Sequence, residues 1–218
     1  MLRTVTVVPT ILSTTKQEYR DLVEKYNTFT RRVQIDVTDG LLTTEPTLDV
    51  TNIWWPKTWE TDLHMMVLHP SDHLETILKL HPSMCIFHAE ADEDLLPIFD
   101  KLREADIKVG VALMKSTYPG KVKDYIMAAD HVLVFAGELG KQGSKADMMQ
   151  TEKIALIRNM KPEIEIGWDG GANLNNLRAL AHADLDVINV GSALSKSDSP
   201  AEVYQSLIAE IDKNGVVI

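Results

Sequence analysis

The sequence predicts a single-domain (β/α)₈ TIM barrel over residues 1–218. Short β-branched and apolar runs alternate with segments that carry apolar residues at helical spacing, and about eight such pairs fit into the chain. No low-complexity linker marks a second domain. A doubly wound parallel sheet is the alternative, because it is built from the same alternation and differs mainly in strand number.

The first two strands set the pattern. The apolar run 4–8 predicts a strand that ends at Pro9, and residues 15–29 predict a helix that starts behind Ser13-Thr14-Thr15. The second strand is expected over 33–40, where β-branched residues alternate with Gln34, Asp36 and Thr38 before Asp39-Gly40. Because side chains repeat every two residues along a strand, these three polar side chains share one face.

The rest of the chain repeats this unit. The run 62–67, closed by Pro70, predicts the third strand, and 71–80 predicts its helix with Ser71 as the N-cap. The later strands are expected over 84–88, 108–113, 131–135, 164–168 and 187–190. Helices are expected over 94–103, up to about 129, through 161, around Leu174, Leu177 and Ala181, and from 199 to 211.

The charge balance limits the classes of partner. The chain has 22 Lys and Arg against 32 Asp and Glu, a formal net charge of −10. This balance argues against nucleic acid or an anionic membrane as the main partner, and it means that an anionic small molecule needs a locally positive site. The single cysteine, Cys85, lies in an apolar run, which indicates a small buried residue in a reducing cytoplasm. The first residues resemble neither a signal peptide nor a membrane span, so we expect a cytoplasmic protein.

Polar residues collect at the expected carboxyl ends of the strands, where parallel barrels carry their active sites. Asp36, His64 and Asp169 could together hold one divalent cation, with Gln34 as a weak fourth ligand through its amide oxygen. Two carboxylates on opposite sides of a substrate also suit a proton transfer through an enediolate, with epimerisation as the outcome. His88 is more simply a hydrogen-bonded core residue than a ligand.

Glycines follow the last two expected strands. Gly170-Gly171 alone would be a tight turn, but together with Gly191-Ser192 the pair matches the place where barrels bind phosphate on backbone N–H groups.

With these residues assembled, the chain resembles the ribulose-phosphate 3-epimerase family from the first strand to the last helix. The segments that carry the resemblance are Pro9-Thr10-Ile11-Leu12-Ser13, Asp36-Val37-Thr38-Asp39-Gly40, His64-Met65-Met66-Val67 with Pro70, His88-Ala89-Glu90-Ala91, Asp169-Gly170-Gly171 and Gly191-Ser192-Ala193.

The resemblance implies an epimerase that interconverts D-ribulose 5-phosphate and D-xylulose 5-phosphate, with Asp36 and Asp169 as the catalytic acid and base. It implies a divalent metal (zinc, iron or manganese) on Asp36, His64 and Asp169, and a phosphorylated sugar as the partner. The substrate-binding residues that it implies are Thr10, His64, Met66, Gly140, Gly143, Gly170, Gly171, Gly191 and Ser192.

The chain departs from the family pattern at the site. Gln34 stands where the family has its first metal-binding histidine, Thr38 replaces a methionine, and the phosphate-covering loop reads Leu139-Gly140-Lys141-Gln142-Gly143-Ser144. Loss of a ligand predicts weaker metal binding, since changes even outside the ligands cost about 10–100-fold.

These departures leave other functions open. The chain could be a catalytically silent or regulatory sugar-phosphate-binding protein, or an epimerase for another ketose phosphate. The decarboxylase and hexulose-phosphate synthase group ranks last, because its strand lysine is missing from Asp36-Val37-Thr38. A homo-oligomer is possible through Trp54-Trp55, although adjacent tryptophans more often cover the chain's own core.

Overall fold

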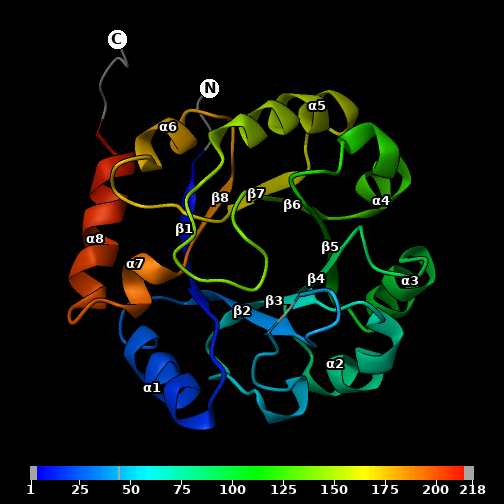
Figure 1. Cartoon of the computed structure of the whole chain (residues 1–218), viewed down its shortest axis with the longest axis horizontal. Coiled ribbons are helices and arrows are strands. Elements are labelled where there is room, and N and C mark those ends of the chain that lie inside the picture. The colour runs from blue at the N-terminus through cyan, green and yellow to red at the C-terminus, as the bar shows by residue number, and fades with distance from the viewer. Residues whose placement is uncertain (1–3, 44, 214–218) are drawn as a thin grey trace.

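A computed structural model describes residues 4–43 and 45–213. Its eight parallel strands close into a barrel in sequence order, with helices around the outside (Figure 1), so the expected (β/α)₈ class is confirmed. The strands are β1 (Thr6–Ile11), β2 (Arg32–Thr38), β3 (Glu60–Met66), β4 (Met84–His88), β5 (Lys108–Leu113), β6 (His131–Phe135), β7 (Glu165–Asp169) and β8 (Val187–Val190).

The helices are short, and several begin with a 3₁₀ turn. They are α1 (Lys16–Tyr26), α2 (Leu74–Leu80), α3 (Leu96–Glu104), α4 (Lys123–Ala128), α5 (Glu152–Met160), α6 (Leu177–Ala181), α7 (Ser192–Ser195) and α8 (Pro200–Ile211), with 3₁₀ turns η1 (Val50–Asn52), η2 (Pro70–His73), η3 (Pro119–Val122) and η4 (Met148–Thr151). No helix of the described residues is long and apolar enough to cross a membrane.

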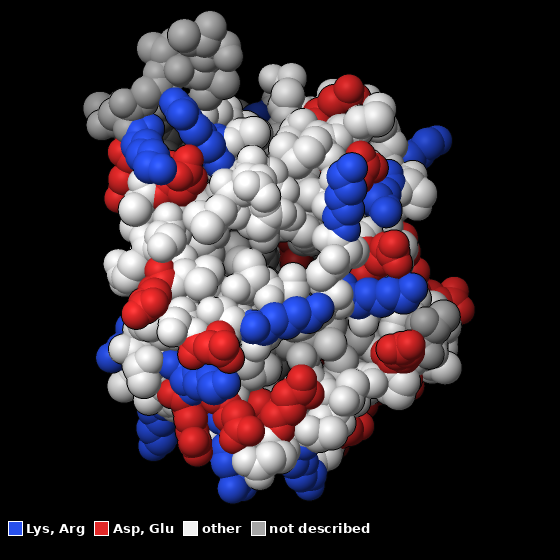
Figure 2. All heavy atoms as spheres, turned by 60° about the vertical axis from the view of Figure 1, so that its left-hand side comes forward, with Lys and Arg blue, Asp and Glu red and all other residues white. Residues whose placement is uncertain are grey.

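Most of the apolar core lies between the barrel and its helices. A second, smaller cluster inside the barrel is formed by Met84, Ile86, Ala112 and Leu133. Cys85 is fully buried, as its apolar surroundings predict. On the face that Figure 2 shows, lysine and arginine side chains lie among acidic ones, and some of them flank a hollow in which acidic atoms are visible.

Three expectations at element ends were wrong. Pro9 does not end the first strand but lies inside β1, opposite Val190 of β8, because pairing on both sides of a closed barrel outweighs one missing N–H donor. Ser71 is not an N-cap; it lies within η2, and both its N–H and its hydroxyl donate to Glu93. Leu174 lies before α6 and is exposed, because Asn173 and Asn176 form a polar turn there.

A charge network holds the amino ends of the strands together. Arg32 at the start of β2 donates to Asp62 of β3 at 2.8 Å and to Glu165 of β7 at 2.7 and 2.9 Å. Glu165 also lies 2.8 Å from Nδ1 of His131 at the start of β6. The Asp62 side chain is only 5% exposed, so it depends on Arg32 for its charge partner.

We therefore expect Arg32→Met to lower the free energy of unfolding by about 3 kcal/mol, because it leaves a buried carboxylate unpaired. Urea unfolding at pH 7 measures this change. Arg20→Met on the exposed side of α1 is the control and should change stability by less than about 0.5 kcal/mol. An Arg32 variant as stable as this control would show that the network contributes little.

Candidate active site

A pocket of about 490 Å³ opens at the carboxyl end of the barrel. Its size suits a small molecule. The residues expected to bind substrate or transfer protons that line it are Thr10, Asp36, Met66, Gly140, Gly143, Asp169, Gly170, Gly171, Gly191 and Ser192. His64 and Gln34 are fully buried and do not line the pocket, so they lie behind its inner surface.

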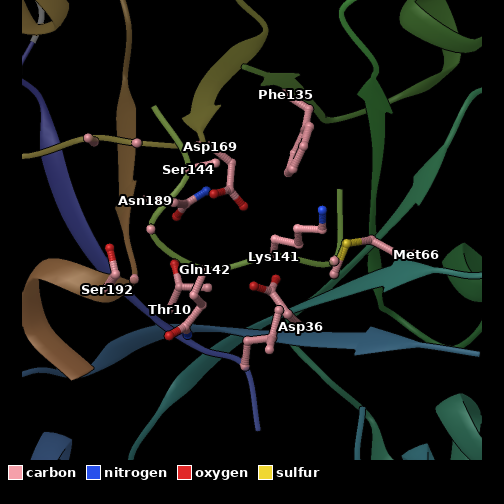
Figure 3. Close-up of a pocket in the computed structure, with 17 residues that line it drawn as sticks. Thr10, Asp36, Met66, Phe135, Lys141, Gln142, Ser144, Asp169, Asn189 and Ser192 are labelled. Carbon is pink, nitrogen blue, oxygen red and sulfur yellow. The ribbon is translucent and has the colours of Figure 1, made fainter. Parts of the chain in front are cut away.

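The segment between β6 and α5 crosses the mouth of the barrel (Figure 1). Gly140 and Gly143 let this loop turn, since their φ angles are +74° and +81°. The loop places Lys141 and Gln142 in the pocket lining, and Figure 3 shows Lys141 reaching across between Asp36 and Met66. The Lys141 ammonium lies 3.2 Å from Glu138 and remains about half exposed.

Two carboxyl groups from different strands face one another in the pocket. Figure 3 shows Asp36 of β2 and Asp169 of β7 pointing toward the same space. Behind them, Gln34 Nε2 donates to Asp36 Oδ1 at 2.9 Å and to Asp169 Oδ2 at 2.6 Å. His64 Nδ1 lies 2.9 Å from the same Asp36 oxygen and 3.7 Å from Asp169 Oδ2. The arrangement joins both carboxyl groups to one buried polar cluster.

Burial changes the acidity of this cluster. Burial raises the pKa of Asp36 to about 7, and burial together with the neighbouring charge of Asp36 raises that of Asp169 to about 7. Burial lowers the pKa of His64 and of His88 to about 4, so both imidazoles are neutral at pH 7. A coupled pair of carboxyl groups with pKa values near neutrality can hold one proton between them.

A hydrogen-bonded series indicates where that proton lies. Asp36 contacts His64, His64 Nε2 lies 2.9 Å from His88 Nε2, and His88 Nδ1 lies 3.3 Å from Glu90. Three hydrogen bonds need three protons, but two neutral imidazoles carry only two. Hydrogen bonds from His88 and Thr117 outweigh burial and lower the pKa of Glu90, so Glu90 is ionised and Asp36 carries the third proton. His88 is thus a hydrogen-bonded core residue, as the sequence suggested.

The same cluster contains a candidate metal site. One ligand atom each of Asp36, His64 and Asp169 lie within 4.8 Å of one another, so these three buried groups could hold a metal ion. The fourth group, Gln34, presents its amide N–H₂ to them rather than its oxygen. An N–H₂ group donates hydrogen bonds and has no lone pair to offer a metal, so the four side chains as they lie do not form a complete ligand set.

The opposite end of the pocket is formed by backbone. Gly170 and Gly171 have φ angles of +111° and +69°, and a Cβ on either would meet backbone atoms of the β6–α5 loop at 2.1–2.2 Å. Gly191 and Ser192 lie beside them at the start of α7. The Lys196 ammonium lies 3.3 Å from the position of a Cβ on Gly143. Glycine turns and a nearby ammonium suit an anionic group.

The polar pocket residues that were not predicted from the sequence as site residues include Lys141, Gln142 and Asn189. Gln142 Nε2, Asn189 Oδ1 and Thr10 Oγ1 are buried atoms without a hydrogen-bond partner among the described residues, and all three residues line the pocket. These atoms offer hydrogen bonds to a hydroxylated ligand. Asn189 could have been found as the one polar residue in the apolar run 187–190. Nothing local distinguished Lys141 or Gln142, which face the pocket because of the loop's path.

Comparison with known proteins identifies relatives of the chain. The family described as "Ribulose-phosphate 3 epimerase family" matches residues 6–195. Ribulose-phosphate 3-epimerase of Schizosaccharomyces pombe is 31% identical over 146 residues, 67% of this chain and 64% of the yeast protein. The cytoplasmic isoform from Oryza sativa subsp. japonica is 28% identical over 155 residues, 69% of this chain and 68% of the rice protein. The match thus spans somewhat less than two thirds of the yeast relative.

Solved structures share the fold at low sequence identity. A 3-hexulose-6-phosphate synthase superposes with a TM-score of 0.72 at 16% identity, covering 95% of this chain and 99% of that one. KGPDC from Streptococcus mutans, in complex with a phosphorylated sugar, gives 0.74 at 10% identity, covering 95% and 97%. They support the barrel fold alone. The family match over nearly the whole barrel is more specific, and the chain belongs to the ribulose-phosphate 3-epimerase family.

Proposed function

We propose that the chain is an isomerase that interconverts the C3 epimers D-ribulose 5-phosphate and D-xylulose 5-phosphate. The observation that carries the proposal is the pair Asp36 and Asp169, two buried carboxyl groups that face one pocket and have pKa values near neutrality. The family of the chain and the names of its relatives support the substrate pair.

In the proposed reaction the two carboxyl groups have opposite roles. Asp169, ionised and hydrogen-bonded to Gln34, removes the proton from C3 and leaves an enediolate. Asp36, protonated toward His64, delivers a proton to the other face of C3. The product leaves with inverted configuration, and the reverse reaction exchanges the two roles. Each step needs only that the protonation states of the two side chains differ.

The negative charge of the enediolate needs compensation. Lys141 supplies an ammonium on the open side of the pocket, and Thr10, Gln142 and Asn189 offer hydrogen bonds to substrate oxygens. A zinc, iron or manganese ion, if bound, would be held by Asp36, His64 and Asp169 and would add positive charge beside these oxygens.

The phosphate is assigned to the glycine-rich end of the pocket. Gly170, Gly171, Gly191 and Ser192 would face it, with Gly143 and the Lys196 ammonium beside them. The phosphorylated sugar bound by the KGPDC barrel of the same fold is consistent with such a ligand here. The rice relative is named a cytoplasmic isoform, and we expect the same compartment for this chain.

Conversion of D-ribulose 5-phosphate tests the proposal. Purified protein should form D-xylulose 5-phosphate, identified by NMR, until the two epimers reach equilibrium. D-Ribulose 5-phosphate that stays unchanged at high protein concentration, with and without Zn²⁺, Fe²⁺ or Mn²⁺, would contradict this substrate assignment and direct the search to other ketose phosphates.

A silent sugar-phosphate-binding protein is the second candidate. It is favoured by the Gln34 amide, which takes up hydrogen-bonding capacity of both carboxyl groups. Calorimetric titration with D-ribulose 5-phosphate, on the same sample as the conversion assay, separates the candidates. Binding without conversion would select the silent protein.

The loop lysine provides a further prediction. Lys141→Met should raise KM for the sugar phosphate about 10-fold, because it removes a positive charge from the pocket wall and an exposed charge interaction is worth roughly 1 kcal/mol. Lys145→Met is the matched control, since Lys145 is exposed on the same loop and does not line the pocket. Equal KM values for the two variants would remove Lys141 from the site.

A further inference from the structure

The Gln34 amide lies among all three candidate metal ligands. Its Nε2 lies 2.9 Å from Asp36 Oδ1, 2.6 Å from Asp169 Oδ2 and 3.4 Å from His64 Nδ1. Gln34 is fully buried, and no part of it lines the pocket. It thus connects the two carboxyl groups from behind, on the side away from the substrate.

The spacing of these atoms is that of a hydrogen-bonded cluster. Ligands about 2.1 Å from a tetrahedral ion lie roughly 3.4 Å from one another. Here both carboxylate contacts of Gln34 Nε2 and the 2.9 Å contact of His64 with Asp36 are shorter than that. To accept a cation, the cluster would have to spread and the amide would have to turn its oxygen inward.

Asn189 opposes that turn. From β8, its Nδ2 donates to Gln34 Oε1 at 2.7 Å, and Asn189 itself is only 2% exposed. If the Gln34 amide turned, its oxygen would face two carboxylate oxygens and its N–H₂ would face the N–H₂ of Asn189. Asn189 would have to turn as well, using its Oδ1, which has no partner in the described part of the chain. The orientation of Gln34 therefore depends on Asn189.

We propose that Gln34 and Asn189 form an amide pair that holds Asp36 and Asp169 together by hydrogen bonds in place of a cation. Gln34 supplies the two donors, and Asn189 is a positioning residue that fixes which end of the Gln34 amide faces the carboxyl groups. The pair leaves the cluster with weak affinity for divalent metal. This inference concerns cation binding alone and stands whether or not the chain epimerises pentulose phosphates.

Titration of the whole chain with Co²⁺, followed by calorimetry and by visible absorption, tests the proposal without any substrate. Gln34→His supplies a ring nitrogen in place of the amide and should bind Co²⁺ about 100-fold more tightly than the natural chain. Asn189→Leu removes the donor that fixes the amide, and we expect Co²⁺ to bind several-fold more tightly. Thr61→Val, which removes a buried hydroxyl from β3 outside the cluster, is the control and should leave the affinity unchanged.

Gln34→Leu distinguishes an amide that excludes the cation from one that ligates it. With the amide removed, three ligands remain, and the affinity for Co²⁺ should equal or exceed that of the natural chain. A loss of 10-fold or more in Gln34→Leu would show that Gln34 is an oxygen ligand and would overturn the proposal. Unchanged Co²⁺ affinity in Asn189→Leu would refute its positioning role. Far-UV and near-UV circular dichroism verifies that each variant is folded.

Discussion

Asp169→Asn and Asp36→Asn should each slow epimerisation by about 10³-fold, since general acid–base groups typically contribute 10²–10⁴-fold. Each change keeps the size of the side chain but removes one proton donor and acceptor. The pocket loses no volume, so substrate affinity should change much less than kcat. Initial rates of xylulose 5-phosphate formation measure this loss.

The two variants should also differ from one another in a way that a structural defect would not produce. The carboxyl group that remains can still remove a C3 proton from the epimer that presents it, exchange that proton with solvent and return it to the same face. We therefore expect each variant in heavy water to incorporate deuterium into one epimer without inverting it, and the two variants to choose opposite epimers. Equal behaviour toward both epimers would contradict the assignment of one carboxyl group to each face.

Gly170→Ala should raise KM for the sugar phosphate about 100-fold, because a displacement of about 1 Å at a site can cost that much. Gly170 has a φ of +111°, and a Cβ there would lie 2.1 Å from the Gly137 nitrogen. The β6–α5 loop would have to move away from the end of β7, and it carries Lys141 and Gln142 with it. Steady-state kinetics and competition by inorganic phosphate measure the change.

Gly191→Ala is the matched control for this variant. Gly191 lines the same end of the pocket, but its φ is −96° and the nearest atom to an added Cβ is 3.7 Å away. An alanine is therefore accommodated, and KM should change by no more than about 3-fold. A Gly170→Ala variant that binds as well as Gly191→Ala would mean that close packing of the loop on β7 does not shape the phosphate end.

The fold could be predicted because the alternation of strands and helices is a local property of the sequence. The runs 84–88, 108–113, 131–135 and 187–190 coincide with β4, β5, β6 and β8. Errors came where tertiary context decides. Pro9 remains in β1 because two neighbouring strands enclose it, and Leu174 is outside α6 because two asparagines form a turn.

The candidate site was predictable where a side chain emerges at a strand end. Asp36 and Asp169 follow from that rule, since parallel strands bring their carboxyl ends together. The contact of Gln34 with Asn189 could not be predicted, because it joins residues 155 positions apart and depends on barrel closure. Whether Gln34 presents nitrogen or oxygen is likewise decided by its partner on β8 and not by its own neighbours in sequence.

The most direct test of the central claim is the position of solvent deuterium after turnover. The unmodified protein is incubated with D-ribulose 5-phosphate in heavy water, and the C3 signals of both epimers are followed by NMR. Two-carboxylate proton transfer predicts that each newly formed D-xylulose 5-phosphate carries deuterium at C3, because the delivered proton comes from a side chain in exchange with solvent. D-Xylulose 5-phosphate that keeps the original C3 hydrogen would contradict the account, since that hydrogen would then have moved without passing through two different carboxyl groups.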